Sequence, residues 1–227
     1  MKLVELTKIK SDSIEELRDS FDNLPETDHK DGKFRLRRYS VIELRTTFWN
    51  ALEEVEITPL PVTDFTQSDE YNKYQGGMKR HFENLEDEVL QSEGFKDICL
   101  AFKRANNMAD GQKVDVHQMR CVTLNGESEL APEGVHQDGF DRIGIVSVNR
   151  HNARGGEVHL YKNVYEVDQG GPLNRPEREP FLKYEMEDGE MVIIDDKKLW
   201  HWGSPVGANT AAKAYVDMII LCAHTSP

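Results

Sequence analysis

The chain has 227 residues, of which 38% are hydrophobic and 30% are charged. This length and composition suit one folded domain with its own core and exclude a disordered chain. The formal net charge of −13 disfavours nucleic acid and anionic membrane surfaces as partners, because both need a basic protein face. Cys99, Cys121 and Cys222 are widely spaced, so the sequence favours neither a zinc finger nor a disulfide scaffold.

The expected cellular location of the protein follows from its hydrophobic pattern. No apolar run approaches the roughly 20 residues that a membrane-spanning helix needs. The first six residues include Lys2 and Glu5, so the chain becomes charged too early for a secretory signal. We therefore expect a cytoplasmic protein with a small-molecule partner, and the sequence leaves its oligomeric state open.

The N-terminal part begins with a strand or an extended arm over residues 1–10. Ser13 and Glu16 form a capping-box pattern, and apolar residues then follow at helical spacing as far as Leu24. Pro25 ends this predicted helix, because proline cannot continue the backbone hydrogen bonding.

The next segments alternate between strand, loop and helix. Residues 34–44 alternate in polarity and carry several arginines, which predicts a strand. Residues 57–77 contain two prolines and a glycine pair and are interpreted as a loop. Residues 80–104 have a helical pattern, and we expect Gly94 to break it into two helices.

From residue 114 onward, short β-rich runs dominate the chain. They are separated by glycine turns and cover residues 114–124, 143–149, 156–162, 190–195 and 215–222. Runs of this length and spacing are typical of an antiparallel sandwich or barrel. The segment 163–180 is rich in glycine, proline and charge, which indicates an exposed excursion or lid.

The predicted fold class is α+β, a double-stranded β-helix (jelly roll, cupin-like) with the N-terminal helices packed outside. We expect a single domain over residues 1–227. Residues 1–110 would be mostly helical support, and residues 111–227 would form the jelly-roll core.

The most informative stretch runs from Pro132 to Gly139. Its His136 and Asp138 are two residues apart, so on an extended chain their side chains point to the same side. A second histidine would complete the 2-His-1-carboxylate triad that leaves open positions on Fe(II). His201 is the best candidate, because it follows an apolar strand and a turn.

Several motifs resemble those of a known family in the same order. They are Gly76-Gly77 with Arg80 and Phe82, His117-Gln118-Met119-Arg120, Pro132 to Gly139, Arg150-His151-Asn152 with Gly155-Gly156-Glu157, and His201 with Ser204-Pro205. The chain thereby resembles the 2-oxoglutarate/Fe(II) dioxygenases, specifically the bacterial branch that hydroxylates free amino acids. The resemblance covers roughly residues 34–222.

This resemblance implies a function and a set of site residues. The cofactors would be Fe(II), 2-oxoglutarate and O2, and the reaction would hydroxylate a C–H bond of a free amino acid. The metal-binding and catalytic residues would be His136, Asp138 and His201, and substrate would contact Arg80, Gln118 and Arg120. Desaturation and ring closure remain open, as do a cupin-like metal isomerase or hydrolase without O2 and a non-enzymatic metal or ligand sensor.

One departure from the family pattern concerns the co-substrate. The family usually has an arginine after the distal histidine that pairs with the far carboxylate of 2-oxoglutarate, and Val216 stands there in this chain. Another cation is needed, because an unpaired buried carboxylate is strongly unfavourable. The candidates are Lys213, Arg150 and Arg120. The alternative is that the co-substrate is a different 2-oxo acid, or that 2-oxoglutarate binds weakly.

Overall fold

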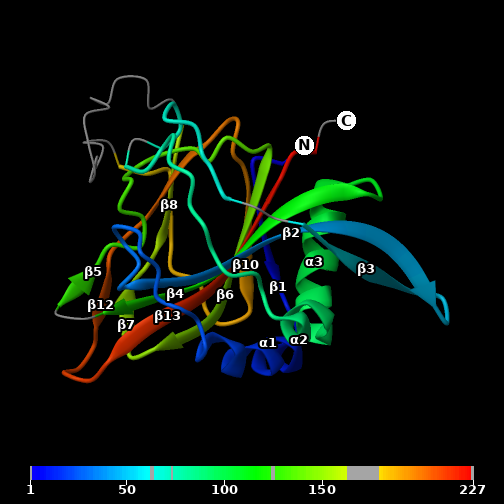
Figure 1. Cartoon of the computed structure of the whole chain (residues 1–227), viewed down its shortest axis with the longest axis horizontal. Helices are drawn as coiled ribbons and strands as arrows, with labels where there is room; N and C mark the ends of the chain where they lie inside the picture. Colours follow the sequence, from blue (N-terminus) through cyan, green and yellow to red (C-terminus); the bar gives the residue numbers. More distant parts are fainter. Residues whose placement is uncertain (1, 62–63, 73, 124–125, 163–178, 226–227) are drawn as a thin grey trace.

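The largest element of the protein is a seven-stranded antiparallel sheet. The computed structural model describes residues 2–61, 64–72, 74–123, 126–162 and 179–225. In spatial order the strands are β1 (Val4–Lys8), β10 (Glu190–Asp195), β6 (Arg142–His151), β13 (Ala214–Ala223), β4 (Gln112–Thr123), β2 (Arg35–Trp49) and β3 (Leu52–Leu60). Figure 1 shows β4, β6, β10 and β13 crossing the centre of the molecule, with the β2–β3 hairpin extending to the right.

Two small antiparallel sheets face one side of this large sheet. One contains β11 (Trp200–Gly203), β8 (Val158–Tyr161) and β9 (Leu182–Tyr184), and the other contains β5 (Glu127–Ser128), β12 (Val206–Ala208) and β7 (Ala153–Gly155). Val158 and Leu160 of β8 pack with Ile143 of β6, while Val206 of β12 packs with Val216 of β13. The large and small sheets therefore enclose an interior, which we call the cavity side.

The helices cover the opposite face of the large sheet, which we call the helix side (Figure 1). They are α1 (Ser11–Leu17), the 3-10 turn η1 (Arg18–Phe21), α2 (Asp87–Gln91) and α3 (Glu93–Asn106). Phe95 and Phe102 of α3 are fully buried in one core with Val146 of β6 and Ile219 of β13. None of the described helices is long and apolar enough to cross a membrane, and the cytoplasmic location stays a prediction.

This architecture confirms the predicted double-stranded β-helix with helices outside, although several boundaries differ. The first helix begins at Ser11, so Ser13 does not cap it, and the Ser13 hydroxyl instead donates to Asp97 Oδ2 at 2.7 Å. The break in the second helical region falls at Ser92, whose side chain accepts a hydrogen bond from the Phe95 N–H. Gly94 lies inside α3, where a Cβ would collide with the carbonyl oxygen of Ser13.

The description of residues 1–110 as mostly helical is wrong, because β2 and β3 form a long hairpin in this part. The predicted loop over residues 57–77 overlaps the end of β3. Pro59 is tolerated there because β3 is an edge strand, which has no further neighbour that needs the missing N–H. Most of the predicted lid, residues 163–178, lies outside the described residues.

Candidate metal centre and its cavity

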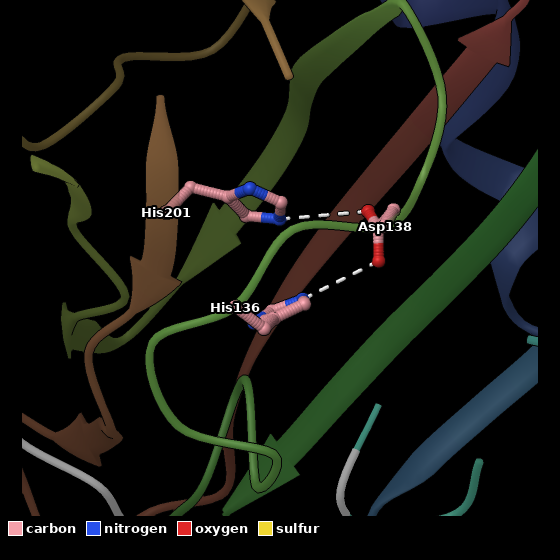
Figure 2. A group of neighbouring side chains, drawn as sticks. All are labelled: His136, Asp138 and His201. Carbon is pink, nitrogen blue, oxygen red and sulfur yellow. Dashed lines mark ion pairs between the residues drawn. The ribbon is translucent and has the colours of Figure 1, made fainter. Parts of the chain in front are cut away.

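Two histidines and one aspartate meet on the cavity side (Figure 2). His136 and Asp138 lie on the segment between β5 and β6, and His201 lies on β11. Paired backbone hydrogen bonds of 3.0 and 2.9 Å join His136 to His201 and bring these distant segments together. The candidate ligand atoms of all three residues lie within 4.8 Å of one another.

Both imidazole rings present Nε2 to the Asp138 carboxylate. The two Nε2 atoms lie 3.4 Å and 3.5 Å from its oxygens. His136 Nδ1 lies 2.8 Å from the carbonyl oxygen of Gly134, and because a carbonyl only accepts, Nδ1 carries the proton. His201 Nδ1 lies 3.4 Å from Asp196 Oδ1, which favours the same tautomer. The Nε2 lone pairs are thus left for a metal ion, as in histidine ligands held by outer partners.

Asp138 and Asp196 are fixed by neighbouring polar groups. Gln67 Nε2 donates to Asp138 Oδ1 at 2.8 Å. The Asp196 carboxylate accepts the backbone N–H groups of Asp138, Gly139 and Phe140 at 3.0, 2.9 and 3.2 Å. Asp196 therefore holds both the Asp138 segment and the His201 ring in position.

The electrostatics of the cluster favour a bound cation. Burial alone would raise the pKa of Asp138, but the adjacent imidazoles of His136 and His201 hold it well below its ordinary value. Burial alone would lower the pKa of His201, but Asp138 and Asp196 raise it to about 10. In the metal-free protein a proton on His201 compensates the carboxylates. Two imidazoles and one carboxylate form a donor set that fits Fe(II).

The cluster borders a cavity whose wall has two chemically different parts, which we call the polar arm and the apolar arm. The polar arm comes from β2, β4 and neighbouring segments and contains Arg35, Arg37, Gln67, Arg80, His117 and Glu133. The apolar arm comes from β6, β8 and β13 with the turn before β8 and contains Ile143, Ile145, Gly156, Val158, Met218 and Ile220.

The polar arm holds buried nitrogen atoms that have no hydrogen-bond partner within the described part of the chain. Arg37 and Arg80 are 5% and 2% exposed, and the Nε atom of each has no hydrogen-bond partner among the described residues. His117 Nδ1 also has no hydrogen-bond partner among these residues. Burial lowers the pKa of Arg37 to about 9, with Arg35 and Arg80 contributing in the same direction. Buried donors without partners are unfavourable, so this arm is suited to an anion.

The structure brings Arg80 to the cavity but not two other predicted substrate residues. Along β4, His117 and Met119 face the cavity, so the alternating residues Gln118 and Arg120 face the helix side. Gln118 donates to Ser20 Oγ at 2.7 Å. Arg120 donates to both oxygens of Asp217 at 2.6 and 2.8 Å. Neither side chain lines the cavity.

The two remaining candidate anchors lie in different settings. Lys213 precedes β13 on the outside of the protein, with its Nζ 5.9 Å from the ring centre of Tyr215, and it does not line the cavity. Arg150 lies at the end of β6, where its Nη2 donates to the carbonyl oxygen of Gly155 at 2.6 Å. Arg150 is adjacent to Gly156, which does line the cavity.

Sequence reasoning assigned no role to Arg35, Arg37, Gln67 or Glu133, which all line the cavity. A signal existed for the two arginines, because they are two residues apart in a predicted strand and must share a face. Glu133 lies inside the Pro132 to Gly139 motif, three residues before His136. Gln67 had no such signal, because it lies in an irregular segment.

Comparisons with known proteins agree with this geometry. A family model described as 2OG-Fe dioxygenase matches residues 18–222. L-isoleucine-4-hydroxylase from Bacillus thuringiensis is 26% identical over 168 residues, with 70% of this chain and 64% of that protein covered. This chain therefore spans less than two thirds of the length of that relative.

Solved structures share the same fold. A BsmA homologue from Methylobium petroleophilum has a TM-score of 0.71 and 21% identity, with 95% of this chain and 82% of that chain covered. The protein IDO from Bacillus thuringiensis has a TM-score of 0.67 and 16% identity, with 98% of this chain and 91% of that chain covered. At these identities the likeness supports the fold alone, and it agrees with the predicted double-stranded β-helix.

Proposed function

This chain belongs to the 2OG-Fe dioxygenase family, and we propose that it hydroxylates a C–H bond of a free amino acid or of a closely similar small molecule. The family uses Fe(II), 2-oxoglutarate and O2, which favours an oxygenase over an isomerase, a hydrolase or a sensor. In this proposal His136, Asp138 and His201 are the iron ligands.

Bound Fe(II), with 2-oxoglutarate and O2, would supply the oxidising chemistry that attacks an unactivated C–H bond. The protein's own contribution is to position the ligands and the substrate. Asp196 and Gly134 fix the two imidazole rings, while Gln67 fixes the Asp138 carboxylate. The apolar arm and Trp202 exclude water from the reacting groups, which protects a reactive centre from side reactions.

The observation that carries the substrate class is a pair of opposite charges beside the metal cluster. Arg37 and Arg80 offer buried donors without partners to a carboxylate. Glu133 Oε1 lies 3.7 Å from His136 Nε2 and can accept from an ammonium group. Burial would raise the pKa of Glu133, but Arg35 and His136 hold it below its ordinary value, so it is an anion. A zwitterion matches this arrangement.

Gln67 connects the two parts of the site. Its Oε1 accepts from Arg80 Nη2 at 2.7 Å, and its Nε2 donates to Asp138 at 2.8 Å. A substrate carboxylate on Arg80 would therefore be held at a fixed position relative to the metal ligand. Such positioning is a major source of rate acceleration, because it removes the entropy of bringing groups together.

The test is a screen of the free amino acids with Fe(II), 2-oxoglutarate and air. We expect succinate in equal amount to a product that has gained one oxygen atom, detected by mass spectrometry. A product that has lost two hydrogens would identify desaturation or ring closure instead. Absence of substrate-dependent succinate with every amino acid would contradict the proposal.

A second comparison tests the zwitterion directly. The best amino acid is compared with its amide and its N-acetyl derivative, which lack the carboxylate or the ammonium charge. We expect both derivatives to raise KM by about tenfold or more, because charged hydrogen bonds contribute roughly 1.5–3 kcal/mol each. Equal KM values for the three compounds would show that the substrate is not recognised as a free amino acid.

A further inference from the structure

2-Oxoglutarate carries two carboxylates, and the distal one must be neutralised wherever it is buried. We propose that Arg150 binds this distal carboxylate, together with the hydroxyl of Ser147, at the far end of the apolar arm. This assignment rests on the proposed function, because it concerns the co-substrate of that same reaction.

A β-bulge in β6 turns Arg150 toward the cavity side. Along the β6–β13 pair, Ser147 lies opposite Met218, but Asn149 lies opposite Asp217, so Val148 is an extra residue. Such a bulge shifts the alternation of the strand by one residue. Arg150 then lies opposite Val216, which packs on the cavity side.

The side chains around the bulge agree with this change of face. Before it, Val146 and Val148 pack in the helix-side core, and regular alternation would place residue 150 with them. After it, His151 stacks on Tyr215 with ring centres 5.0 Å apart. Tyr215 is on the helix side, because Arg120 lies over its ring at 4.0 Å. Arg150, one residue from His151, therefore faces the interior.

Gly156 provides the opening between the cavity and Arg150. A Cβ built on Gly156 would lie 3.4 Å from Arg150 Nη1 and 3.7 Å from Val216 Cγ2. Gly156 itself lines the cavity, as do Met218 and Val158 of the apolar arm. The absence of a side chain at residue 156 thus leaves the guanidinium within reach of a ligand in this arm.

A second polar group on the same face needs a partner. Ser147 is 1% exposed, and its Oγ has no hydrogen-bond partner among the described residues. Its neighbours on this face are apolar, because Ile145 precedes it on β6 and Met218 lies opposite. A buried hydroxyl without a partner is unfavourable, and a ligand carboxylate would satisfy it.

Arg150 is held in place for such a role without being fully neutralised. Its Nη2 donates to the carbonyl oxygen of Gly155 at 2.6 Å and lies 3.0 Å from Glu185 Oε1. The Glu185 side chain is 49% exposed, so water screens this ion pair. Val216, where the family pattern led us to expect an arginine, is the cross-strand neighbour of Arg150. The cation proposed to replace the family's arginine thus lies on β6, the strand adjacent to β13.

The experiment measures anaerobic binding to the Fe(II)-loaded protein by calorimetry and by the absorbance of the iron–2-oxo acid complex. 2-Oxoglutarate is compared with 2-oxobutyrate, which has the same metal-binding end but no distal carboxylate. The variants are Arg150→Ala, Arg150→Lys and Ser147→Ala. The matched control is Arg154→Ala, which removes an exposed arginine of β7 that pairs with Glu127.

We expect wild-type protein and Arg154→Ala to prefer 2-oxoglutarate strongly over 2-oxobutyrate. In Arg150→Ala, 2-oxoglutarate should bind about 10- to 100-fold more weakly while 2-oxobutyrate is unchanged, because a charged hydrogen-bond partner is lost. Arg150→Lys should retain part of the preference, because lysine keeps the charge without the planar fork. Ser147→Ala should reduce the preference by roughly a few-fold.

Two outcomes would overturn this assignment while leaving the proposed function intact. One is an equal loss of affinity for both 2-oxo acids in Arg150→Ala, which would indicate a structural defect. The other is a preference for 2-oxoglutarate that survives in Arg150→Ala but disappears in Arg37→Met. If wild-type protein with Fe(II) binds no 2-oxoglutarate, the proposed function and this assignment fail together.

Discussion

The two faces of the large sheet use buried arginines in opposite ways. On the helix side, Arg120 donates Nε and Nη2 to Asp217 and Nη1 to Asp22. On the cavity side, Arg37 has Asp31 at 3.3 Å, while its Nε has no partner among the described residues. Both arginines are 5% exposed, so burial does not distinguish them.

The charges around the two guanidiniums explain the difference. Burial opposes the charge of Arg120, but Asp217 and Asp22 raise its pKa above the ordinary value. Burial, Arg35 and Arg80 instead lower the pKa of Arg37 to about 9. An arginine with satisfied donors stabilises the fold, whereas an arginine with a missing anion is prepared for a ligand. The following predictions test this distinction, and they start from the metal ligands that adjoin the cavity side.

The largest effect is expected for Asp138→Ala, which removes the only carboxylate of the three-residue cluster. Turnover should fall by about 10³-fold or more, because metal-dependent catalysis lowers the activation barrier by several kcal/mol. The measurement is substrate-dependent succinate formation, with the exposed Asp28→Ala as control. Normal turnover in Asp138→Ala would show that iron is held elsewhere.

The next prediction compares the two faces of the large sheet directly. Arg37→Met should raise KM for the substrate by about 100-fold, because a buried carboxylate loses a charged donor pair. The free energy of unfolding should stay the same or rise, because the repulsion from Arg35 and Arg80 is relieved and Asp31 keeps its ion pair with Arg35 at 2.8 Å. KM and urea unfolding are measured on the same preparations.

The matched variant on the helix side is Arg120→Met. It should lower the free energy of unfolding by about 3–5 kcal/mol, because Asp217 is left buried without its partner. KM of the folded protein should not change. If Arg120→Met raised KM as much as Arg37→Met does, the distinction between the two faces would be wrong.

A smaller effect is expected from Asp196→Asn, which weakens the group that orients His201. Metal affinity should fall by about 10- to 100-fold, as is usual for the outer partner of a histidine ligand. Anaerobic calorimetry with Fe(II) measures this loss. Asp195→Asn is the control, because its carboxylate pairs with Arg142 and Lys198 rather than with a ligand. Equal losses in both variants would point to general destabilisation.

The most gradual effect is the pH dependence of the metal-free protein. The pKa of His201 is raised from 6.5 to about 10, so its stabilising contribution is complete below pH 6.5 and is lost as the pH rises to about 10. Metal binding needs the neutral ring, so metal affinity should rise over the same window by at most about tenfold per pH unit. Thermal unfolding across this window should show stability falling as the pH rises, and calorimetric titration should show metal affinity rising. His201→Gln should remove both pH dependences.

Much of the candidate site could be predicted from local spacing. His136 and Asp138 share a side because they are two residues apart on an extended segment, and His201 follows an apolar strand that ends in a turn. Five strands of the second half, β4, β6, β8, β10 and β13, were also predicted, because their hydrophobic runs and glycine turns are local features, whereas the short strands β5, β7, β9, β11 and β12 were not. The hairpin of β2 and β3 was missed in part because Pro59 suggested a loop, although an edge strand accepts proline.

The sequence by itself determined which residues share a face of a strand: Arg35 with Arg37, and Gln118 with Arg120. Only the tertiary structure decided which of these faces borders the cavity and which packs against the helices. The bulge that turns Arg150 inward depends on its pairing with β13, more than sixty residues away in the chain. The physical reason is that alternation is a property of one strand, whereas the environment of each face is set by the distant segments that pack on it.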